Sequence, residues 1–233
     1  MPRSIPDGRF QQLVDAASAV FIAQGYRRTQ MADVAEAMGV AKGTIYLYVE
    51  SKDALFDVVL RSADVPRPID TPGTMPVPTP PAGRTLKYLR DRLTQPASPT
   101  LRRALGRKSP RVNGDELTTI LSEIYESMAR SRTGIKLVDR CAIDYPELAQ
   151  VWFTEGREAL LGELSRYLTG GMRKGGIRVG ADPGVAARLV LETLVFWAVH
   201  RHWDPSPQSV DEKTARDAVI HLLVAALSKD GEP

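Results

Sequence analysis

Residues 29–48 read TQMADVAEAMGVAKGTIYLY, and this stretch decides the fold of the first part of the chain. Its first apolar residues recur at the spacing of one short helical face, at Met31, Val34, Ala35 and Met38. Thr29 is expected to cap this helix, and Gly39 to end it in a left-handed conformation. A second short helix is expected over residues 41–49. Two short helices joined by a glycine turn predict a helix-turn-helix over 29–48, whose second helix enters the major groove of DNA.

One further helix is predicted on each side of this motif. Upstream, a single apolar stripe precedes Gly25 and is formed by Phe10, Leu13, Val14, Ala17, Val20 and Phe21. Downstream, Ser51 is placed to cap a helix that has to end before Pro66. The sequence therefore predicts a compact helical DNA-binding domain over residues 6–66.

A proline-rich stretch follows this domain. Its prolines stand at positions 66, 68, 72, 76, 78, 80 and 81, so residues 67–83 are expected to form an extended connector without a helix. Helical periodicity then resumes, at about residues 84–95, 99–108, 115–144, 147–174, 183–203 and 211–229. No alternating β-branched stretch competes with this pattern. The predicted fold class is all-α, with a second helical domain over residues 84–233.

The outward positions of the second short helix are small or polar. Gly43 allows a close backbone approach, Thr44 offers a hydroxyl and a methyl group to base edges, and Lys42 can reach a phosphate. The chemistry at this position suits the floor of a DNA groove. The alternative for any one of these residues is an ordinary solvated surface position.

The segment GVAKGTIYLY at 39–48, followed by VESKDAL at 49–55, closely resembles the signature of TetR/AcrR-type transcriptional regulators. The resemblance covers roughly residues 9–63. It implies that seven residues contact DNA: Thr29 at a phosphate, Lys42, Gly43 and Thr44 at the bases, and Tyr46, Tyr48 and Lys52 at the backbone. Two positions depart from the family, which often has histidine where Tyr48 stands and phenylalanine where Val49 stands.

The same resemblance implies a C-terminal domain for ligand binding and dimerisation. The helix at 183–203 is apolar nearly all round, and the helix at 211–229 carries a stripe of small residues, so both suit a homodimer interface. Their alternative is an internal core. Tyr125, Trp152 and Trp197 are candidates for the pocket of a small apolar or amphipathic inducer, and core packing is the alternative for each. The implied function is a repressor that binds a near-palindromic operator, with control by a protein partner as the second possibility.

Composition limits the other classes. The net charge is only +3, and the basic stretch 84–111 fits either DNA phosphates or a solvated helix face. The single cysteine, Cys141, excludes an intrachain disulfide, and no apolar run reaches the ~18–20 residues of a membrane span. No secretory signal opens the sequence, so a cytoplasmic protein is expected. An enzyme is a remote alternative: His200 and His202 form no metal motif, a three-histidine site with His221 is the remaining possibility, and no cofactor or metal is expected.

Overall fold

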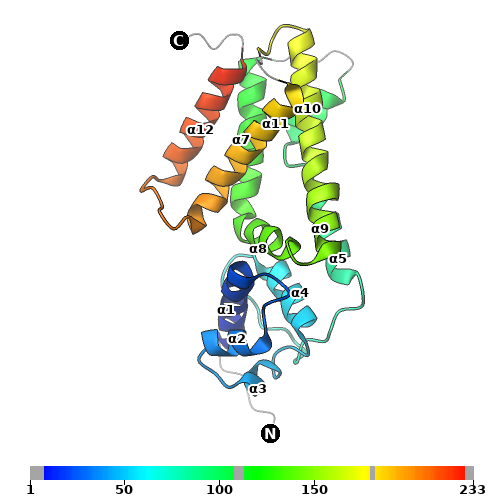
Figure 1. Cartoon of the computed structure of the whole chain (residues 1–233), viewed down its shortest axis with the longest axis vertical. Helices are drawn as coiled ribbons and strands as arrows, with labels where there is room; N and C mark the ends of the chain where they lie inside the picture. Colours follow the sequence, from blue (N-terminus) through cyan, green and yellow to red (C-terminus); the bar gives the residue numbers. More distant parts are fainter. Residues whose placement is uncertain (1–7, 108–112, 179–181, 229–233) are drawn as a thin grey trace. The chain divides into compact units, whose positions relative to one another are not determined.

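A computed structural model describes residues 8–107, 113–178 and 182–228. These residues are built from helices, and the extended segments among them form two isolated β-bridges instead of a sheet (Figure 1). The all-α prediction is confirmed. The chain divides into an N-terminal unit, Met1–Arg92 with Thr133–Trp152, and a C-terminal unit, Leu93–Arg132 with Phe153–Pro233.

The N-terminal unit is organised around α1. Its helices are α1 (Arg9–Gln24), α2 (Met31–Ala37), α3 (Lys42–Ile45), α4 (Lys52–Ser62), α5 (Arg84–Leu93), α8 (Arg132–Ala142) and α9 (Pro146–Ala149). The predicted stripe of α1 is buried against α2 and α4, and the rings of Phe21 and Phe56 meet edge to face with centroids 5.3 Å apart. Ser51 caps α4 as expected, because its hydroxyl accepts the amide of Ala54 at 3.1 Å.

Two helices from later in the sequence belong to this unit. The Asp144 carboxylate accepts the backbone amides of Tyr26 and Arg27 at 3.0 and 3.2 Å, just after α1 ends. Gly25 has φ +88°, and a Cβ there would lie 2.7 Å from that carboxylate, so glycine is required both for the turn and for the space. Arg140 donates to the carbonyl of Gln24 at 3.2 Å. Residues of α8 and the loop after it thus close the end of α1.

The long helix expected over residues 115–144 is wrong as one element. It breaks at Ser131, giving α7 (Gly114–Arg130) and α8. The reason is a capping contact from another part of the chain, because the Asp64 carboxylate accepts the amides of Thr133 and Gly134, both at 3.1 Å. A new helix therefore starts at this point, although the apolar pattern itself runs on.

The C-terminal unit packs its long helices against one another. They are α6 (Pro99–Leu105), α7, α10 (Glu158–Arg173), α11 (Pro183–Ala198) and α12 (Glu212–Leu227). The helix expected at 183–203 ends at Ala198 and continues as a short 3-10 turn, η2 (His200–Trp203). The helix expected at 147–174 is interrupted by a π-helical stretch, η1 (Gln150–Arg157). Both α10 and α12 pack on α11.

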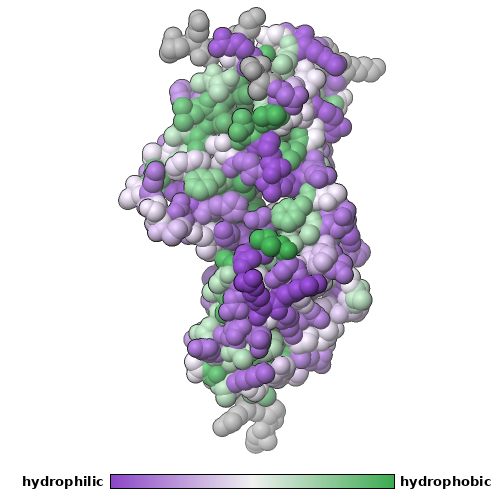
Figure 2. All heavy atoms as spheres, in the orientation of Figure 1, coloured by the Kyte–Doolittle hydropathy of each residue, from purple (hydrophilic) through white to green (hydrophobic). Residues whose placement is uncertain are grey.

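One side of α11 and α12 is not covered within the described chain. Exposed large apolar side chains are Val185, Leu189 and Phe196 on α11, Trp203 after it and Leu222 on α12. Figure 2 shows apolar side chains gathered on the face of the C-terminal unit where α11 and α12 lie. None of the helices within the described ranges is long and apolar enough to cross a lipid bilayer.

The proline-rich connector holds no helix, as predicted, but it does not separate the compact units. Residues up to Arg92 belong to the N-terminal unit, so the division differs from the boundary expected at residue 66. Val77 pairs with Val49 in a parallel β-bridge. The connector is therefore part of the N-terminal unit.

Candidate nucleic-acid interface

The helix-turn-helix begins one residue later than expected. Gln30, not Thr29, is the N-cap of α2, and its backbone amide donates to the Asp33 carboxylate at 2.8 Å. Gly39 ends the helix with φ +65°, and the amide of Val40 reaches the carbonyl of Ala35 at 2.9 Å. This 6→1 bond is a Schellman closure, which confirms the role predicted for Gly39.

The second helix of the motif is short. Regular α3 covers only Lys42–Ile45, and residues 46–49 continue as hydrogen-bonded turns rather than as the helix expected to residue 49. We call residues 42–49 the recognition turn. Ile45 and Val49 are fully buried and anchor it to the domain, as predicted. Their burial fixes which side of the turn faces outward.

The outward side carries five residues. Lys42, Gly43 and Tyr46 are exposed, and Thr44 is partly exposed, in keeping with the prediction for these positions. Leu47 is 59% exposed and was not among the predicted contacts, although its place in the TIYLY segment puts it beside Tyr46. An exposed leucine can contact a thymine methyl group. The turn therefore offers a backbone approach at Gly43, the hydroxyls of Thr44 and Tyr46, one cation and one apolar group.

Three of the predicted contact residues are turned inward and make contacts within the fold. Thr29 is 1% exposed, and its hydroxyl donates to the Gly25 carbonyl at 2.6 Å. Tyr48 is 5% exposed, which corrects its predicted outward position. The ammonium of Lys52 donates to three backbone carbonyls, those of Tyr26, Arg27 and Thr29, at 3.0, 3.3 and 3.2 Å. An ammonium has three donors, so this internal set uses all of them.

A small polar cluster holds Lys52 in this position. Its ammonium lies over the Tyr26 ring, 4.6 Å from the centroid, and the Tyr26 hydroxyl bonds to Asp53. Burial and the neighbouring Asp53 raise the pKa of Tyr26, so the phenol stays protonated as a donor. Tyr145 stacks on the other side of Tyr26 with centroids 4.6 Å apart. These contacts tie α4, the loop before α2 and α9 together.

Arg27 and Arg28 are two further cations of this surface that were not among the expected DNA contacts. Both are exposed and stand just before α2, and neither side chain makes an ion pair with any residue that the structure describes. The signal was present as an adjacent pair of arginines at the start of the motif. Cations at this edge of a helix-turn-helix suit the DNA backbone.

The basic helix α5 is largely occupied with its own unit. Lys87 pairs with Asp91 at 2.7 Å, and Arg92 approaches Asp64 at 3.9 Å. In Figure 1 the label of α5 lies at the end of this unit away from α3. The solvated-face interpretation is favoured for this part of the 84–111 stretch, while residues 108–112 lie outside the described residues.

Two of the three candidate pocket residues are brought together, because the Tyr125 hydroxyl donates to the Trp197 carbonyl at 3.4 Å. Trp197 lines a hollow of about 490 Å³ in the C-terminal unit, with Phe196, Arg201 and Glu212. Tyr125 is buried beside it and donates to Glu212 at 3.0 Å. Trp152 belongs to the N-terminal unit, where its indole nitrogen donates to Asp139 at 3.2 Å.

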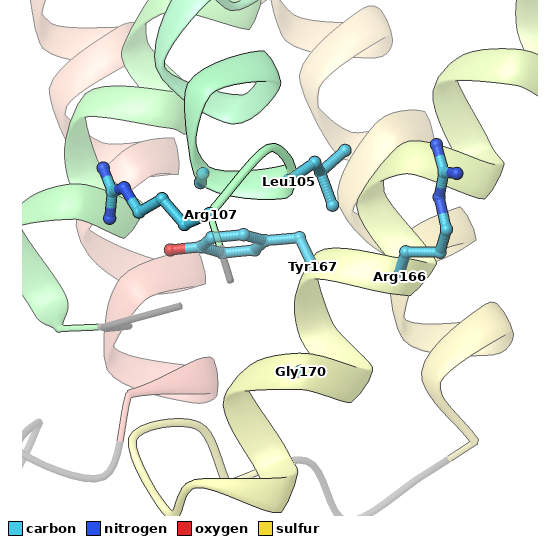
Figure 3. Close-up of a pocket in the computed structure, with 6 residues that line it drawn as sticks. Leu105, Arg107, Arg166, Tyr167 and Gly170 are labelled. Atoms are coloured by element: carbon cyan, nitrogen blue, oxygen red, sulfur yellow. The ribbon is translucent and has the colours of Figure 1, made fainter. Parts of the chain in front are cut away.

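A second, smaller hollow lies between α6 and α10. It measures about 230 Å³, and Figure 3 shows the Tyr167 ring crossing it, with Arg107 near the hydroxyl end and Arg166 on the far side. Arg107 pairs with Glu116 at 2.5 Å, and Tyr167 donates to the same carboxylate at 3.3 Å. In the described parts of the chain no group of three His, Cys, Asp or Glu residues could hold a metal ion.

Comparison with known proteins agrees with this geometry. Residues 13–59 match the family described as bacterial regulatory proteins, tetR family. The fatty acid metabolism regulator protein of Bacillus subtilis (strain 168) is 21% identical over 224 residues, 94% of this chain and 95% of that protein. The HTH-type transcriptional repressor KstR2 of Rhodococcus jostii (strain RHA1) is 37% identical over 54 residues, 23% of this chain and 26% of that protein.

Solved structures extend the likeness of fold to the C-terminal unit. The ketosteroid transcriptional regulator KstR2 of Mycobacterium tuberculosis matches 97% of this chain and 98% of its own, with a TM-score of 0.57 at 16% identity. A tetR-family regulatory protein from Rhodococcus RHA1 matches 94% and 96%, with a TM-score of 0.53 at 14% identity. Residues 13–59 are thus similar to the DNA-binding part of the tetR family, and the chain shares its overall fold with these two solved regulators.

Proposed function

We propose that the protein is a cytoplasmic repressor that binds a near-palindromic operator as a homodimer and leaves it when a small ligand binds. The observation that carries the DNA-binding part is the recognition turn. Lys42, Gly43 and Thr44 point outward, while Ile45 and Val49 are fully buried beneath them. A rigidly anchored turn with a small polar outer face can approach base edges closely.

We assign different roles to the remaining residues of the motif. Tyr46, Arg27 and Arg28 are exposed and are placed at the phosphate backbone. Thr29, Tyr48 and Lys52 are assigned to holding the motif in shape, because their polar groups or rings are turned inward. The expectation that these three contact DNA stays a prediction, and the salt dependence of binding separates the two roles.

We assign the exposed face of α11 and α12 to a second copy of the chain. Leu189 on α11 and Leu222 on α12 are exposed leucines on helices that pack side by side. A self-complementary apolar face is typical of a twofold interface, and a dimer presents two recognition turns to two half-sites. The near-palindromic operator follows from that symmetry.

The hollow beside Trp197 is the better candidate for the ligand. Its volume of about 490 Å³ falls within the range of ~300–1,000 Å³ typical of small-molecule sites. Arg201, its most basic group, already donates to the carbonyls of Trp197 and Val210 and to Glu212. The polar wall is therefore satisfied internally, which favours an apolar or amphipathic ligand. The Bacillus subtilis relative regulates fatty acid metabolism, so acyl chains are the first class to test.

Ligand control requires a population shift between a form that fits both half-sites and one that does not. Within the N-terminal unit, Asp64 and Asp144 fasten the two ends of α8 to the DNA-binding helices. A displacement of α8 would therefore also move the DNA-binding helices to which Asp64 and Asp144 fasten it. Control by a protein partner is the alternative, with the exposed face of α11 and α12 as its docking surface.

Selection of bound DNA from a random pool with the purified protein tests the proposal. We expect a single enriched motif with inverted half-sites about one or two helical turns apart. Light scattering on the same sample should give the mass of a dimer. Failure to enrich any motif would contradict the DNA-binding proposal, and a monomer with an asymmetric motif would contradict the dimer.

A further inference from the structure

The proline-rich segment 66–81 is bonded to the DNA-binding helices at both of its ends, and its far end meets the recognition turn. We propose that this segment, which we call the strap, is a positioning element that fixes the recognition turn and thereby sets sequence discrimination. The proposal rests on the proposed function, because discrimination has meaning only for a protein that reads DNA.

The contact with the recognition turn is made through the backbone. The amide of Val77 donates to the Tyr48 carbonyl at 2.7 Å, and the amide of Glu50 donates to the Val77 carbonyl at 3.0 Å. The Tyr48 carbonyl and the Glu50 amide both lie past the end of the short helix α3, where helical hydrogen bonds no longer satisfy them. The strap therefore supplies partners to backbone groups at the end of the turn.

Two side-chain contacts extend this pairing. The amide of Thr79 donates to the Glu50 carboxylate at 2.9 Å, and the hydroxyls of Thr79 and Ser51 lie 2.8 Å apart. Ser51 is also the N-cap of α4. The strap thus grips the junction at which the recognition turn ends and the next helix begins.

The near end of the strap is tied to α1. The amide of Ile69 donates to the side chain of Gln11 at 2.9 Å, and Arg67 pairs with Asp15 at 2.9 Å. Gln11 and Asp15 are one helical turn apart on the same face of α1. Because both of its ends are bonded, the strap connects α1 to the end of the recognition turn.

The recognition turn needs such support because of its length. A helix of four residues is not stable by itself, since nucleation is unfavourable and few bonds repay it. Ile45 and Val49 anchor only its inner side. The hydrogen bonds between Val77 and the backbone of Tyr48 and Glu50 restrain the turn further, because they limit its rotation about these two buried side chains.

The composition of the strap suits this task and argues against direct binding to phosphate. Prolines reduce the conformational entropy that a tethered segment loses on folding. The only charged residues between 66 and 81 are Arg67 and Asp70, and Arg67 is paired with Asp15. The strap therefore offers DNA no unpaired positive charge. Its effect on binding should pass through the turn that it holds.

The test compares two proline substitutions within the strap. Val77→Pro removes the amide that donates to Tyr48, whereas Thr74→Pro falls where the amide makes no hydrogen bond within the described residues. The measured quantity is the ratio of affinity for the selected operator to affinity for random duplex, at one salt concentration. Loss of one hydrogen bond and of the attached restraint should reduce this ratio about fivefold or more in Val77→Pro, with Thr74→Pro unchanged.

Hydrogen exchange provides a readout that does not depend on DNA. The amide of Glu50 should exchange faster in Val77→Pro than in Thr74→Pro, because its acceptor is on the loosened strap. If Val77→Pro does not fold, Thr79→Pro repeats the test by removing the donor to Glu50 at an exposed position. Equal specificity ratios in the bonded and unbonded variants would overturn the proposal. A protein that enriches no DNA motif would instead overturn the proposed function, while the exchange result would still decide whether the strap holds the turn.

Discussion

The recognition turn and the helix pair α11–α12 are both assigned to a partner, but they are held in different ways. The turn contains a four-residue helix, and bonds from Val77 and two buried anchors set its position. The pair consists of two helices of 16 residues each, with regular bonding along their length. The first region depends on contacts from distant residues, whereas the second keeps its shape locally and lacks cover on one side.

This difference has a consequence for mutations. Substitutions that disturb the turn should act through inward residues that never touch DNA. Substitutions on α11 or α12 should act at the outward residues, since the helices themselves would remain.

The largest effect is expected from a charge on the exposed face of α11. Leu189 is 61% exposed, and in a dimer Leu189→Glu would bury a carboxylate in each copy and lose the burial of two leucines. At ~1.5–3 kcal/mol for each leucine, dimerisation should weaken about 100-fold or more. Light scattering and operator binding measure this loss.

Ile143→Glu is the matched control for Leu189→Glu. Ile143 is 68% exposed and belongs to the N-terminal unit, which contains neither α11 nor α12. The Ile143→Glu variant should remain dimeric. If both variants stay dimeric at micromolar concentration, α11 is not the interface and the symmetry argument fails.

The next effect concerns an inward residue of the reading domain. Lys52→Met should lower the free energy of unfolding by about 2–3 kcal/mol, because three backbone carbonyls lose a charged donor. The salt dependence of operator binding should keep its slope. Chemical unfolding and binding at several salt concentrations measure the two quantities.

Arg28→Met provides the opposite pattern. Arg28 is exposed beside α2, so its loss should leave stability unchanged and reduce the salt slope by about one per copy of the chain. A reduced slope in Lys52→Met would show that Lys52 contacts a phosphate after all. Lys52 would then act as an outward residue, and the distinction between inward and outward residues would fail for this side chain.

A smaller effect is expected at the outer face of the turn. Thr44→Ala removes a partly exposed hydroxyl and methyl group with little change to the buried side. Preference at one base pair of each half-site should relax by about 1–3 kcal/mol, with unchanged affinity for random DNA. Selection from a random pool with the variant measures this change. Equal losses on operator and random duplex would refute a base-reading role.

The same contrast explains how much the sequence could predict. Periodicity predicted α1 and α4, and glycine chemistry predicted the closure of α2 at Gly39, because these features depend on neighbouring residues. The break at Ser131 was missed, because its cause is the Asp64 carboxylate, far away in the sequence. Local pattern cannot show a cap that comes from another helix.

The site was predicted in part for a related reason. Lys42 and Gly43 are outward as expected, because helical register fixes their direction, and Tyr46, which only the resemblance placed at the DNA backbone, is exposed as well. The resemblance implies that Lys52 contacts the DNA backbone. In the structure its ammonium donates to three carbonyls of the loop before α2. Nothing in the spacing of residues shows which partner a long side chain will find. The strap was missed because prolines predict an extended segment but not its place.

The smallest effect concerns acid stability in the C-terminal unit. Burial alone would raise the pKa of Glu212, but hydrogen bonds from Tyr125 and Arg201 and the charge of Arg132 lower it below its usual 4.5. A carboxylate with a depressed folded pKa adds stability above its unfolded pKa and loses it as pH falls through the lower folded value. Unfolding experiments should therefore show a loss of stability as the pH falls below about 4.5, the usual pKa of a glutamate.

Glu212→Gln should flatten this part of the pH profile, and Glu158→Gln, at an exposed position on α10, should leave it unchanged. His202 also faces Glu212, at 3.4 Å, and burial together with Arg132 and Arg201 lowers its pKa below 6.5. Its contribution is lost as pH falls below its unfolded value of about 6.5, so it lies at higher pH than that of Glu212. If the loss of stability below about pH 4.5 is as steep in Glu212→Gln as in the unchanged protein, the carboxylate does not stabilise the junction of η2 and α12. Glu212 also lines the hollow beside Trp197, so this side of the proposed ligand site would then not be held in place by the carboxylate.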